Sequence, residues 1–250
     1  MTEPSAVSVK LVGDASSEPS AQLLDYLYES RIQISDSADY LLYINEDHLA
    51  LAATSDKKTI VRVDFNDSKT RWRQAQSELL HRAIGISEQR KPRVLDATAG
   101  MGQDAFALAS RGCEVTMVEQ HPLIHLLLKD GLRRSKGTDN ADVTDRLTLL
   151  HADAKKFLRQ SNETFDVIYL DPMFPEKRGS AKTKKAMQLL RQMLTDDVDD
   201  VELLEGAIAQ AKHRVVIKRP IKAPEFAGRK PGYTLKGRNV RYDIFGIKAY

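Results

Sequence analysis

An acidic residue and a stiff loop follow a short apolar run in the second half of the chain. Residues 171–175 read Asp-Pro-Met-Phe-Pro and come directly after the run 167–170. The Asp171 carboxylate and the Pro172 carbonyl can accept the hydrogens of an exocyclic amine, and the Phe174 ring can stack on a base. These three residues are therefore candidate catalytic residues. The alternatives are an ordinary turn, which Asp-Pro commonly begins, and a core position for Phe174.

A glycine-rich turn follows the strand predicted at 93–96. There the sequence reads Asp-Ala-Thr-Ala-Gly-Met-Gly-Gln-Asp, and Gly100 and Gly102 allow a tight turn with close approach to a ligand. Gln103 and Asp104 then begin a predicted helix at 104–110, whose first N–H groups have no partner within the helix. The glycine spacing alone also fits a dinucleotide site.

Carboxylates after successive strands distinguish a site for S-adenosylmethionine from a site for NAD. Glu119, after the strand predicted at 114–118, suits ribose hydroxyls, as it would in an NAD site. Asp96 would repel a pyrophosphate but attract an amino-acid ammonium group, and Asp153 suits an adenine amine. Together these acids favour S-adenosylmethionine over NAD. The alternative for Asp104 and Asp153 is that each only caps a helix.

The elements that must position these residues alternate between strand and helix after residue 91. The predicted strands are 93–96, 114–118, 147–150, 166–170 and 214–218, and the predicted helices are 104–110, 122–134, 154–160, 183–194 and 200–211. This alternation predicts an α/β fold with a parallel sheet covered by helices on both faces. Two further strands, 233–236 and 242–247, predict a C-terminal antiparallel hairpin.

The first third of the chain predicts a smaller, mostly antiparallel α+β subdomain. We expect a strand at 7–12, a helix at 21–30, a hairpin at 40–45 and 48–53, and a strand at 59–65. The predicted organisation is an N-terminal subdomain at 1–69, a connecting helix at 70–90 and an α/β domain at 91–250.

Charge is distributed unevenly along the chain. Residues 1–90 hold 10 Lys and Arg against 14 Asp and Glu, whereas residues 91–250 hold 28 against 21. Two basic runs near the 171–175 loop indicate contact with a nucleic-acid backbone, the alternative being solvated helix faces. The candidate RNA-binding residues are Lys177, Arg178, Lys182, Lys184, Lys185, Lys218 and Arg219.

Composition excludes several classes of protein. The single cysteine, Cys113, rules out a disulfide framework or a cysteine zinc site, and it lies away from the substrate loop, which excludes cysteine-dependent methylation. Six scattered histidines indicate no metal site. No apolar run approaches eighteen residues and no signal pattern begins the chain, so we expect a soluble, cytoplasmic protein.

Taken in order, the segments DATAGMGQD, VEQ, HADA and YLDPMFP resemble those of the class I, Rossmann-like methyltransferases. The DPMFP segment resembles the Asp/Asn-Pro-Pro-Tyr/Phe motif of enzymes that methylate exocyclic base amines, with Met173 in place of the second proline. More closely, YLDPMFP, the basic stretch after it and VIKRP at 216–220 are similar to the ribosomal RNA small subunit methyltransferase J family, over about residues 90–250.

This resemblance implies N2 methylation of one guanine near the 3′ end of 16S rRNA. Its implied cofactor is S-adenosylmethionine and its implied partner is 16S rRNA or the 30S subunit, with 91–250 as the methyltransferase domain. The cofactor contacts that it implies fall on Gln103, Asp104, Glu119, Gln120, Asp153, Ala154 and Asp171.

Three other functions remain open from the residues. One is methylation of another base amine, such as adenine N6 in RNA or DNA. Another is an NAD-dependent oxidoreductase, although no proton-relay residue or substrate domain is evident after the sheet. The third is an RNA-binding assembly factor without turnover, against which the acids at every strand end argue.

Overall fold

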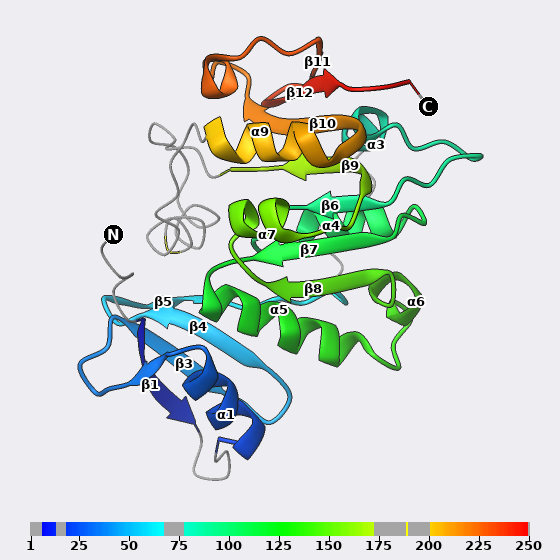
Figure 1. Ribbon diagram of the computed structural model, residues 1–250. Coiled ribbons are helices and arrows are strands. Elements are labelled where there is room, and N and C mark those ends of the chain that lie inside the picture. Colours follow the sequence, from blue (N-terminus) through cyan, green and yellow to red (C-terminus); the bar gives the residue numbers. More distant parts are fainter. Residues whose placement is uncertain (1–6, 14–18, 68–77, 173–188, 190–200, 250) are drawn as a thin grey trace.

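The computed structural model describes residues 7–13, 19–67, 78–172, 189 and 201–249, and shows a large sheet beside a small one (Figure 1). The N-terminal elements are β1 (Ser8–Gly13), α1 (Ala21–Glu29), β2 (Gln33–Ile34), β3 (Tyr40–Ile44), β4 (Leu49–Ala53) and β5 (Asp56–Val61), followed by α3 (Glu78–Ile84). The remaining elements are β6 (Val94–Asp96), α4 (Gln103–Ala109), β7 (Val115–Glu119), α5 (Pro122–Ser135), α6 (Ala141–Thr144), β8 (Leu147–His151), α7 (Ala154–Gln160), β9 (Phe165–Leu170), α9 (Val201–Gln210), β10 (Ala211–Pro220), η1 (Phe226–Gly228), β11 (Tyr233–Lys236) and β12 (Val240–Gly246).

The large sheet has the strand order β11-β12-β10-β9-β6-β7-β8. Strands β10, β9, β6, β7 and β8 are parallel, and β12 and β11 extend the sheet as an antiparallel hairpin. Successive residues of one strand point to opposite faces, so Val167 and Tyr169 pack with α4 and α5, while Ile168 and Leu170 pack with α7 and α9. The predicted Rossmann-like α/β fold and its C-terminal hairpin are confirmed.

The small sheet has the strand order β2-β1-β3-β4-β5 and differs from the prediction. Strand β1 pairs in parallel with both β2 and β3, and only the β3–β4 and β4–β5 pairs are antiparallel. The expectation of a mostly antiparallel subdomain is therefore wrong, because α1 carries the chain across the sheet from β1 to its parallel neighbours. The strand predicted at 59–65 also ends early, at Val61.

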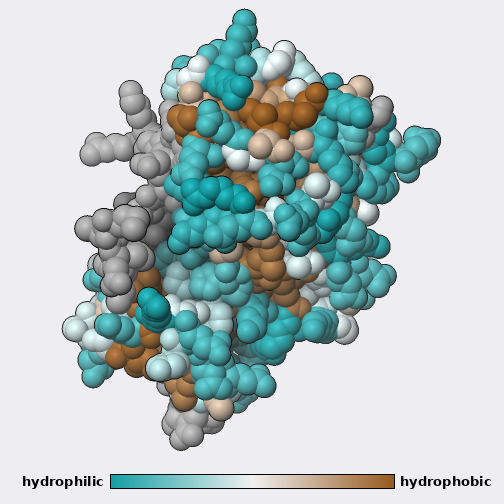
Figure 2. Space-filling view, viewed as in Figure 1, coloured by the Kyte–Doolittle hydropathy of each residue, from teal (hydrophilic) through white to brown (hydrophobic). Residues whose placement is uncertain are grey.

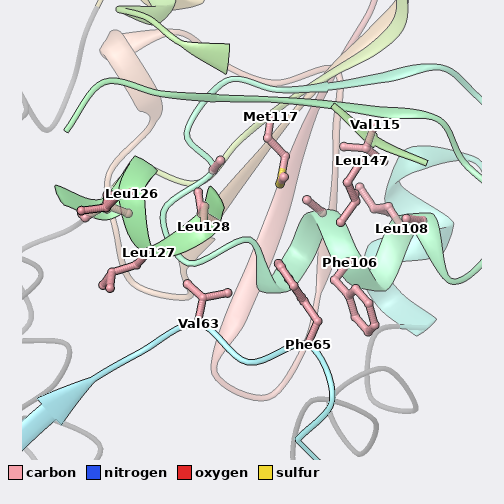
Figure 3. Close-up of a cluster of buried hydrophobic side chains, with 14 of the residues drawn as sticks. Val63, Phe65, Phe106, Leu108, Val115, Met117, Leu126, Leu127, Leu128 and Leu147 are labelled. Carbon is pink, nitrogen blue, oxygen red and sulfur yellow. The ribbon is translucent and has the colours of Figure 1, made fainter. Parts of the chain in front are cut away.

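After Val61 the chain leaves the small sheet and enters the core beneath the large one (Figure 3). Phe65 stacks on Phe106 of α4 with ring centroids 5.1 Å apart. A Cβ on Gly131 of α5 would lie 2.5 Å from Cγ1 of Val63, so only glycine lets this segment lie against α5. Residues of both sheets consequently share one hydrophobic core, and the predicted limits at residues 69 and 90 stay predictions.

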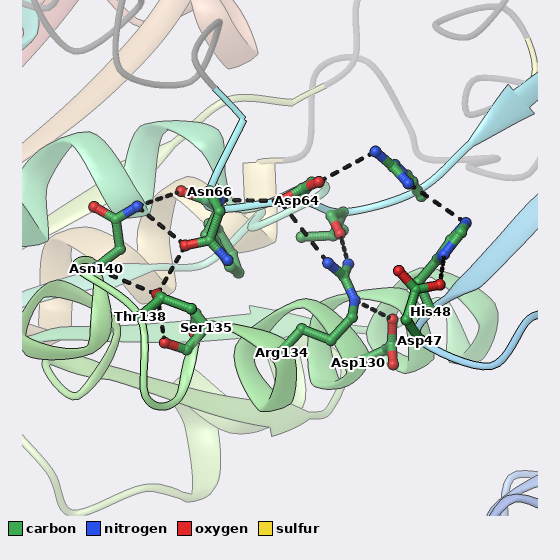
Figure 4. A network of polar contacts seen from close by, with 12 residues as sticks. Asp47, His48, Asp64, Asn66, Asp130, Arg134, Ser135, Thr138 and Asn140 are labelled. Atoms are coloured by element: carbon green, nitrogen blue, oxygen red, sulfur yellow. Dashed lines mark hydrogen bonds and ion pairs between the residues drawn. The ribbon is translucent and has the colours of Figure 1, made fainter.

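Polar contacts hold the same boundary along α5 (Figure 4). Asp130 accepts hydrogen bonds from the Leu49 backbone N–H at 3.0 Å, from Arg134 Nε at 2.9 Å and from Arg133 at 2.8 Å. Arg134 also donates to the Val63 carbonyl. Helix α5 therefore lies between β8 and the small sheet with its buried acid paired.

The surface in Figure 2 is mainly hydrophilic, with apolar residues visible as separate areas. Among the described residues, no helix is long and apolar enough to cross a membrane. The helix predicted from residue 70 is described only from Glu78 to Ile84.

Candidate active site

The strand order reverses direction between β6 and β9, and the candidate catalytic residue lies at this reversal. From β6 the chain proceeds through β7 and β8 on one side, then returns to β9 and β10 on the other. Open α/β sheets bind ligands outside the carboxyl ends of their strands at such a point. Asp96 ends β6 and Asp171 follows β9, so both predicted acids flank it.

Two backbone hydrogen bonds fix the ends of these strands to each other. The Ala97 N–H donates to the Tyr169 carbonyl at 3.1 Å. The Asp171 N–H donates to Oγ1 of Thr98 at 2.6 Å. Thr98 was not among the predicted site residues, since its partner becomes evident only once β6 and β9 are known to be neighbours. It sets the position from which Asp171 begins its loop.

One lysine bridges two of the predicted acids. Nζ of Lys218, on β10, lies 2.7 Å from Oδ2 of Asp104 and 2.9 Å from Oδ2 of Asp171. The Tyr169 hydroxyl donates to the same Asp104 oxygen at 2.5 Å. The helix-cap alternative for Asp104 is wrong, because Gly102 occupies the N-cap position of α4 without a side-chain bond. Asp104 instead belongs to a charged cluster with Lys218 and Asp171.

Burial controls the ionisation of this cluster. It raises the pKa of Asp96 well above its ordinary value, and the charge of Asp104 raises it further. Burial also raises the pKa of Asp171, with Lys218 opposing and Asp104 adding to the shift. For Lys218, burial favours the neutral amine, but the two carboxylates more than offset this and raise its pKa. Lys218 therefore stays charged among three acids.

Glu119 lies at the end of β7, next to the glycine turn. Its Oε2 accepts from the Gly100 N–H at 2.9 Å, and its Oε1 accepts from the His121 N–H at 2.7 Å. At Gly100, with φ of 53°, a Cβ would meet nothing nearer than 4.0 Å, so the space before it is open to a ligand. At Gly102 the Cβ would lie 2.8 Å from Leu128, so this glycine serves core packing rather than ligand approach.

The remaining predicted cofactor residues lie beside Glu119. Asp153 caps α7, its Oδ1 accepting from the Lys156 N–H at 3.0 Å, which agrees with the cap alternative. Ala154 begins α7, and the carbonyl of the exposed Gln120 accepts from His151 Nε2 at 3.2 Å. Gln103 begins α4. All predicted cofactor residues therefore lie at one edge of the sheet.

Tyr26 of α1 joins the small subdomain to this edge by hydrogen bonds. Its hydroxyl lies 2.9 Å from the Pro122 carbonyl and 2.8 Å from Nδ1 of His125. A carbonyl only accepts, so the phenol donates to Pro122 and His125 Nδ1 donates to the phenol. Burial lowers the pKa of His125 to about 4, with the nearby His151 adding to the shift, so this ring is neutral.

The predicted RNA contacts divide into two groups. Lys177, Arg178, Lys182, Lys184 and Lys185 lie outside the described residues, as do Met173 and the catalytic candidate Phe174. The two described candidates require correction. Arg219 is fully buried, donates to the Pro224 carbonyl at 2.7 Å and lies over the Phe226 ring, so it has no surface for a phosphate. The side chain of Lys218 faces the side of the sheet opposite to that of Arg219 and is held by ion pairs with Asp104 and Asp171.

Sequence reasoning also missed two tyrosines behind the acids. Tyr169 and Tyr242 are both buried, and burial followed by the charge of Asp104 raises the pKa of each phenol. Both rings lie within strands, where an aromatic residue predicts only a core position. Their hydroxyls become recognisable as site groups only from the strand order.

A parallel sheet with carboxylates after successive strands, a glycine turn and acids at the strand reversal defines a class I S-adenosylmethionine-dependent methyltransferase. A family model described as "Putative SAM-dependent methyltransferase" matches residues 26–247. The chain is 46% identical over 221 residues to ribosomal RNA small subunit methyltransferase J of Pseudomonas paraeruginosa, covering 86% of this chain and 85% of that protein. It is 44% identical to the protein of the same name from Marinobacter nauticus, covering 84% and 78%.

A solved structure has the same fold over nearly the whole chain. The SAM-dependent methyltransferase NGO1261 of Neisseria gonorrhoeae superposes with a TM-score of 0.76 at 28% identity, covering 98% of this chain and 97% of that one. The chain belongs to the ribosomal RNA small subunit methyltransferase J family, and its cofactor is S-adenosylmethionine.

Proposed function

We propose that this protein transfers a methyl group from S-adenosylmethionine to the exocyclic N2 amine of a guanine in small-subunit ribosomal RNA. The observation that supports this most directly is the position of Asp171 and Pro172 at the strand reversal, with Asp171 held by Thr98 and Lys218. The curated relatives, whose names state small-subunit ribosomal RNA, supply the class of substrate.

The residues at this edge fit the cofactor in charge and in space. Among the described residues, Asp104 and Asp171 share the ammonium of Lys218 and the buried Asp96 lies near both, so the cluster favours added positive charge. The cofactor carries a sulfonium and an ammonium group. Glu119, beside the open space at Gly100, would accept from the ribose hydroxyls, and Asp153 from the adenine amine.

The bound cofactor supplies an electrophilic methyl group, and the protein's own residues prepare the amine that attacks it. An exocyclic amine is a weak nucleophile because its lone pair is delocalised into the ring. The Asp171 carboxylate and the Pro172 carbonyl, by accepting its two hydrogens, would direct that lone pair towards the methyl carbon. Orientation of the two reactants then provides much of the rate.

Proton transfer completes the balance of the reaction. As the N–C bond forms and the C–S bond breaks, the nitrogen becomes acidic and loses one proton. The raised pKa of Asp171 makes its carboxylate a suitable acceptor, from which the proton passes to solvent. Phe174, outside the described residues, would stack on a base that is unpaired or turned out of its helix.

The test is methyl transfer from the tritiated cofactor to unmodified 30S subunits, naked 16S rRNA and DNA in parallel. We expect N2-methylguanosine after nucleoside digestion of the ribosomal RNA and no label in the DNA. Label in N6-methyladenosine would contradict the choice of base. Calorimetry that detects NAD but not S-adenosylmethionine would contradict the function as a whole.

A further inference from the structure

The turn of the C-terminal hairpin lies at the same edge of the sheet as the active site. Strand β12 runs antiparallel to β10, and Val240 at its start pairs with Pro220 at the end of β10. Lys218, which contacts Asp171, is level with Tyr242 and Leu235. Residues 236–239 therefore lie one step further towards the carboxyl edge, roughly 10–15 Å from β9 at about 4.8 Å per strand.

Three exposed cations lie on this turn and on the neighbouring loop, and we name them the hairpin rim: Lys222, Lys236 and Arg238. The Ile221 N–H donates to the Asn239 carbonyl at 3.3 Å, so the loop and the turn lie side by side. Among the described residues, these three cations have no ion-pair partner. The only acid between residues 212 and 238 is Glu225.

Arg241 makes the rim rigid. Its guanidinium donates to the carbonyls of Ile221 at 2.9 Å, Ala223 at 2.7 Å and Pro224 at 3.1 Å. The buried carboxylate of Asp243 orients the same guanidinium at 3.0 Å. Arginine presents its donors in a fixed planar fork, so one side chain fixes the path of the whole loop.

The hairpin turn is anchored from its other side by α3. The Gly237 N–H donates to the Val240 carbonyl at 2.8 Å, and a Cβ on Gly237 would lie 3.0 Å from Leu79 of α3. A cation on a fixed turn loses little backbone entropy when it meets an anion. Arg241 and Leu79 thus hold these three cations, which have no ion pair within the described part of the chain, beside the reacting edge.

We propose that the hairpin rim binds the RNA phosphate backbone next to the target nucleotide and so holds the RNA against the active site. This proposal rests on the proposed function for its substrate class. Lys and Arg that neutralise phosphates supply affinity and position without reading sequence. In this proposal the cations of the hairpin rim take the role in RNA binding that the sequence predicted for Lys218 and Arg219, because the fold holds those two residues in other contacts.

The test compares two triple variants that lose the same charge. One is Lys222→Gln with Lys236→Gln and Arg238→Gln. The matched control is Lys91→Gln with Lys212→Gln and Lys248→Gln, three exposed lysines at the opposite, amino edge of the strands. Filter binding of the wild-type protein and both variants to naked 16S rRNA and to 30S subunits is measured between 50 and 200 mM salt, with calorimetry of S-adenosylmethionine binding.

For the rim variant we expect roughly tenfold weaker RNA binding or more, and a salt slope of log K lower by about 2 to 3. Cofactor affinity and the RNA binding of the control variant should match the wild type. Equal RNA binding by both variants would overturn the proposal. So would a rim variant that loses 30S subunits but retains naked 16S rRNA, since the rim would then contact ribosomal protein.

These outcomes are separate from those of the proposed function. RNA binding is measured without turnover, so the rim is tested even if the wild-type protein transfers no methyl group. Conversely, normal methyl transfer with unchanged RNA binding in the rim variant would contradict only the proposal for the hairpin rim and would not affect the proposed function.

Discussion

Two regions of this molecule hold clusters of acids, and the two regions treat those acids in opposite ways. Along α5, Asp130 is matched by Arg133 and Arg134, and Asp64 by Arg62 and Arg134. At the carboxyl edge of the large sheet, Asp104 and Asp171 share the ammonium of Lys218, and the buried Asp96 lies near both carboxylates. A fully paired buried acid holds two parts of a fold together. An acid in excess of its cations costs stability and leaves room for a cationic ligand.

The largest expected effect comes from removing the carboxylate of Asp130 from its ion pairs on α5. Asp130→Asn should lower the free energy of unfolding by about 3–5 kcal/mol, because it removes the buried carboxylate that pairs with the largely buried Arg134 and leaves that arginine only the more distant Asp64. Urea unfolding followed by circular dichroism measures this. The control is Asp25→Asn on the exposed face of α1, for which a change within about 0.5 kcal/mol is expected. Equal stability of the two variants would show that Asp130 does not hold the boundary.

The second effect concerns chemistry rather than folding. Asp171→Asn should reduce the rate of methyl transfer by roughly 10²–10³, the usual loss for one group aimed at the reacting centre. Its melting temperature should stay at or above that of the wild type, because a like charge beside Asp104 is removed. Asp166→Asn, at the other end of β9, is the matched control. Full activity of the Asp171 variant would show that Asp171 has no role in methyl transfer.

The third prediction is opposite in sign to the first, because replacing Asp96 should raise the free energy of unfolding. The pKa of Asp96 is raised in the folded state, so its contribution to stability falls as pH rises from about 4, the unfolded value, through the folded pKa. Asp96→Asn lacks this penalty and should be more stable than the wild type by about 0.5–2 kcal/mol at neutral pH. Melting temperatures at pH 7.5 and 4.5 should show a gain that disappears at the lower pH. A variant destabilised at both values would place Asp96 among the structural acids.

The smallest effect tests the contact between α1 and the cofactor edge. Tyr26→Phe removes the hydrogen bonds to Pro122 and His125 and should cost about 1 kcal/mol of stability. Because Pro122 follows the Glu119 loop, the affinity for S-adenosylmethionine should fall slightly as well. Tyr28→Phe, on the exposed side of the same helix, should change neither quantity. Equal affinities of both variants for S-adenosylmethionine in calorimetry would show that the Tyr26 contacts do not affect the cofactor edge.

The sequence predicts those features that depend only on neighbouring residues along the chain, such as strand ends and turns. The strands that end at or just before Asp96, Glu119 and Asp171, and the hairpin around Gly237, are predicted correctly because periodicity and turn residues mark them locally. The bonds of Thr98 to Asp171 and of Lys218 to Asp104 depend on which strands are neighbours. The parallel pairing of β1, the entry of Phe65 into the core and the burial of Arg219 depend on it too. No local pattern contains this information.

The entry of Val63 and Phe65 beneath the large sheet sets an order of events during synthesis. The partners of this segment, from Phe106 of α4 to Asn140, whose side chain donates to the Phe65 carbonyl, leave the ribosome later. At about 5–20 residues per second, roughly 4 to 15 seconds pass before those partners are made. The first subdomain of a newly made chain therefore waits with its apolar segment exposed until the helices that cover it have been translated.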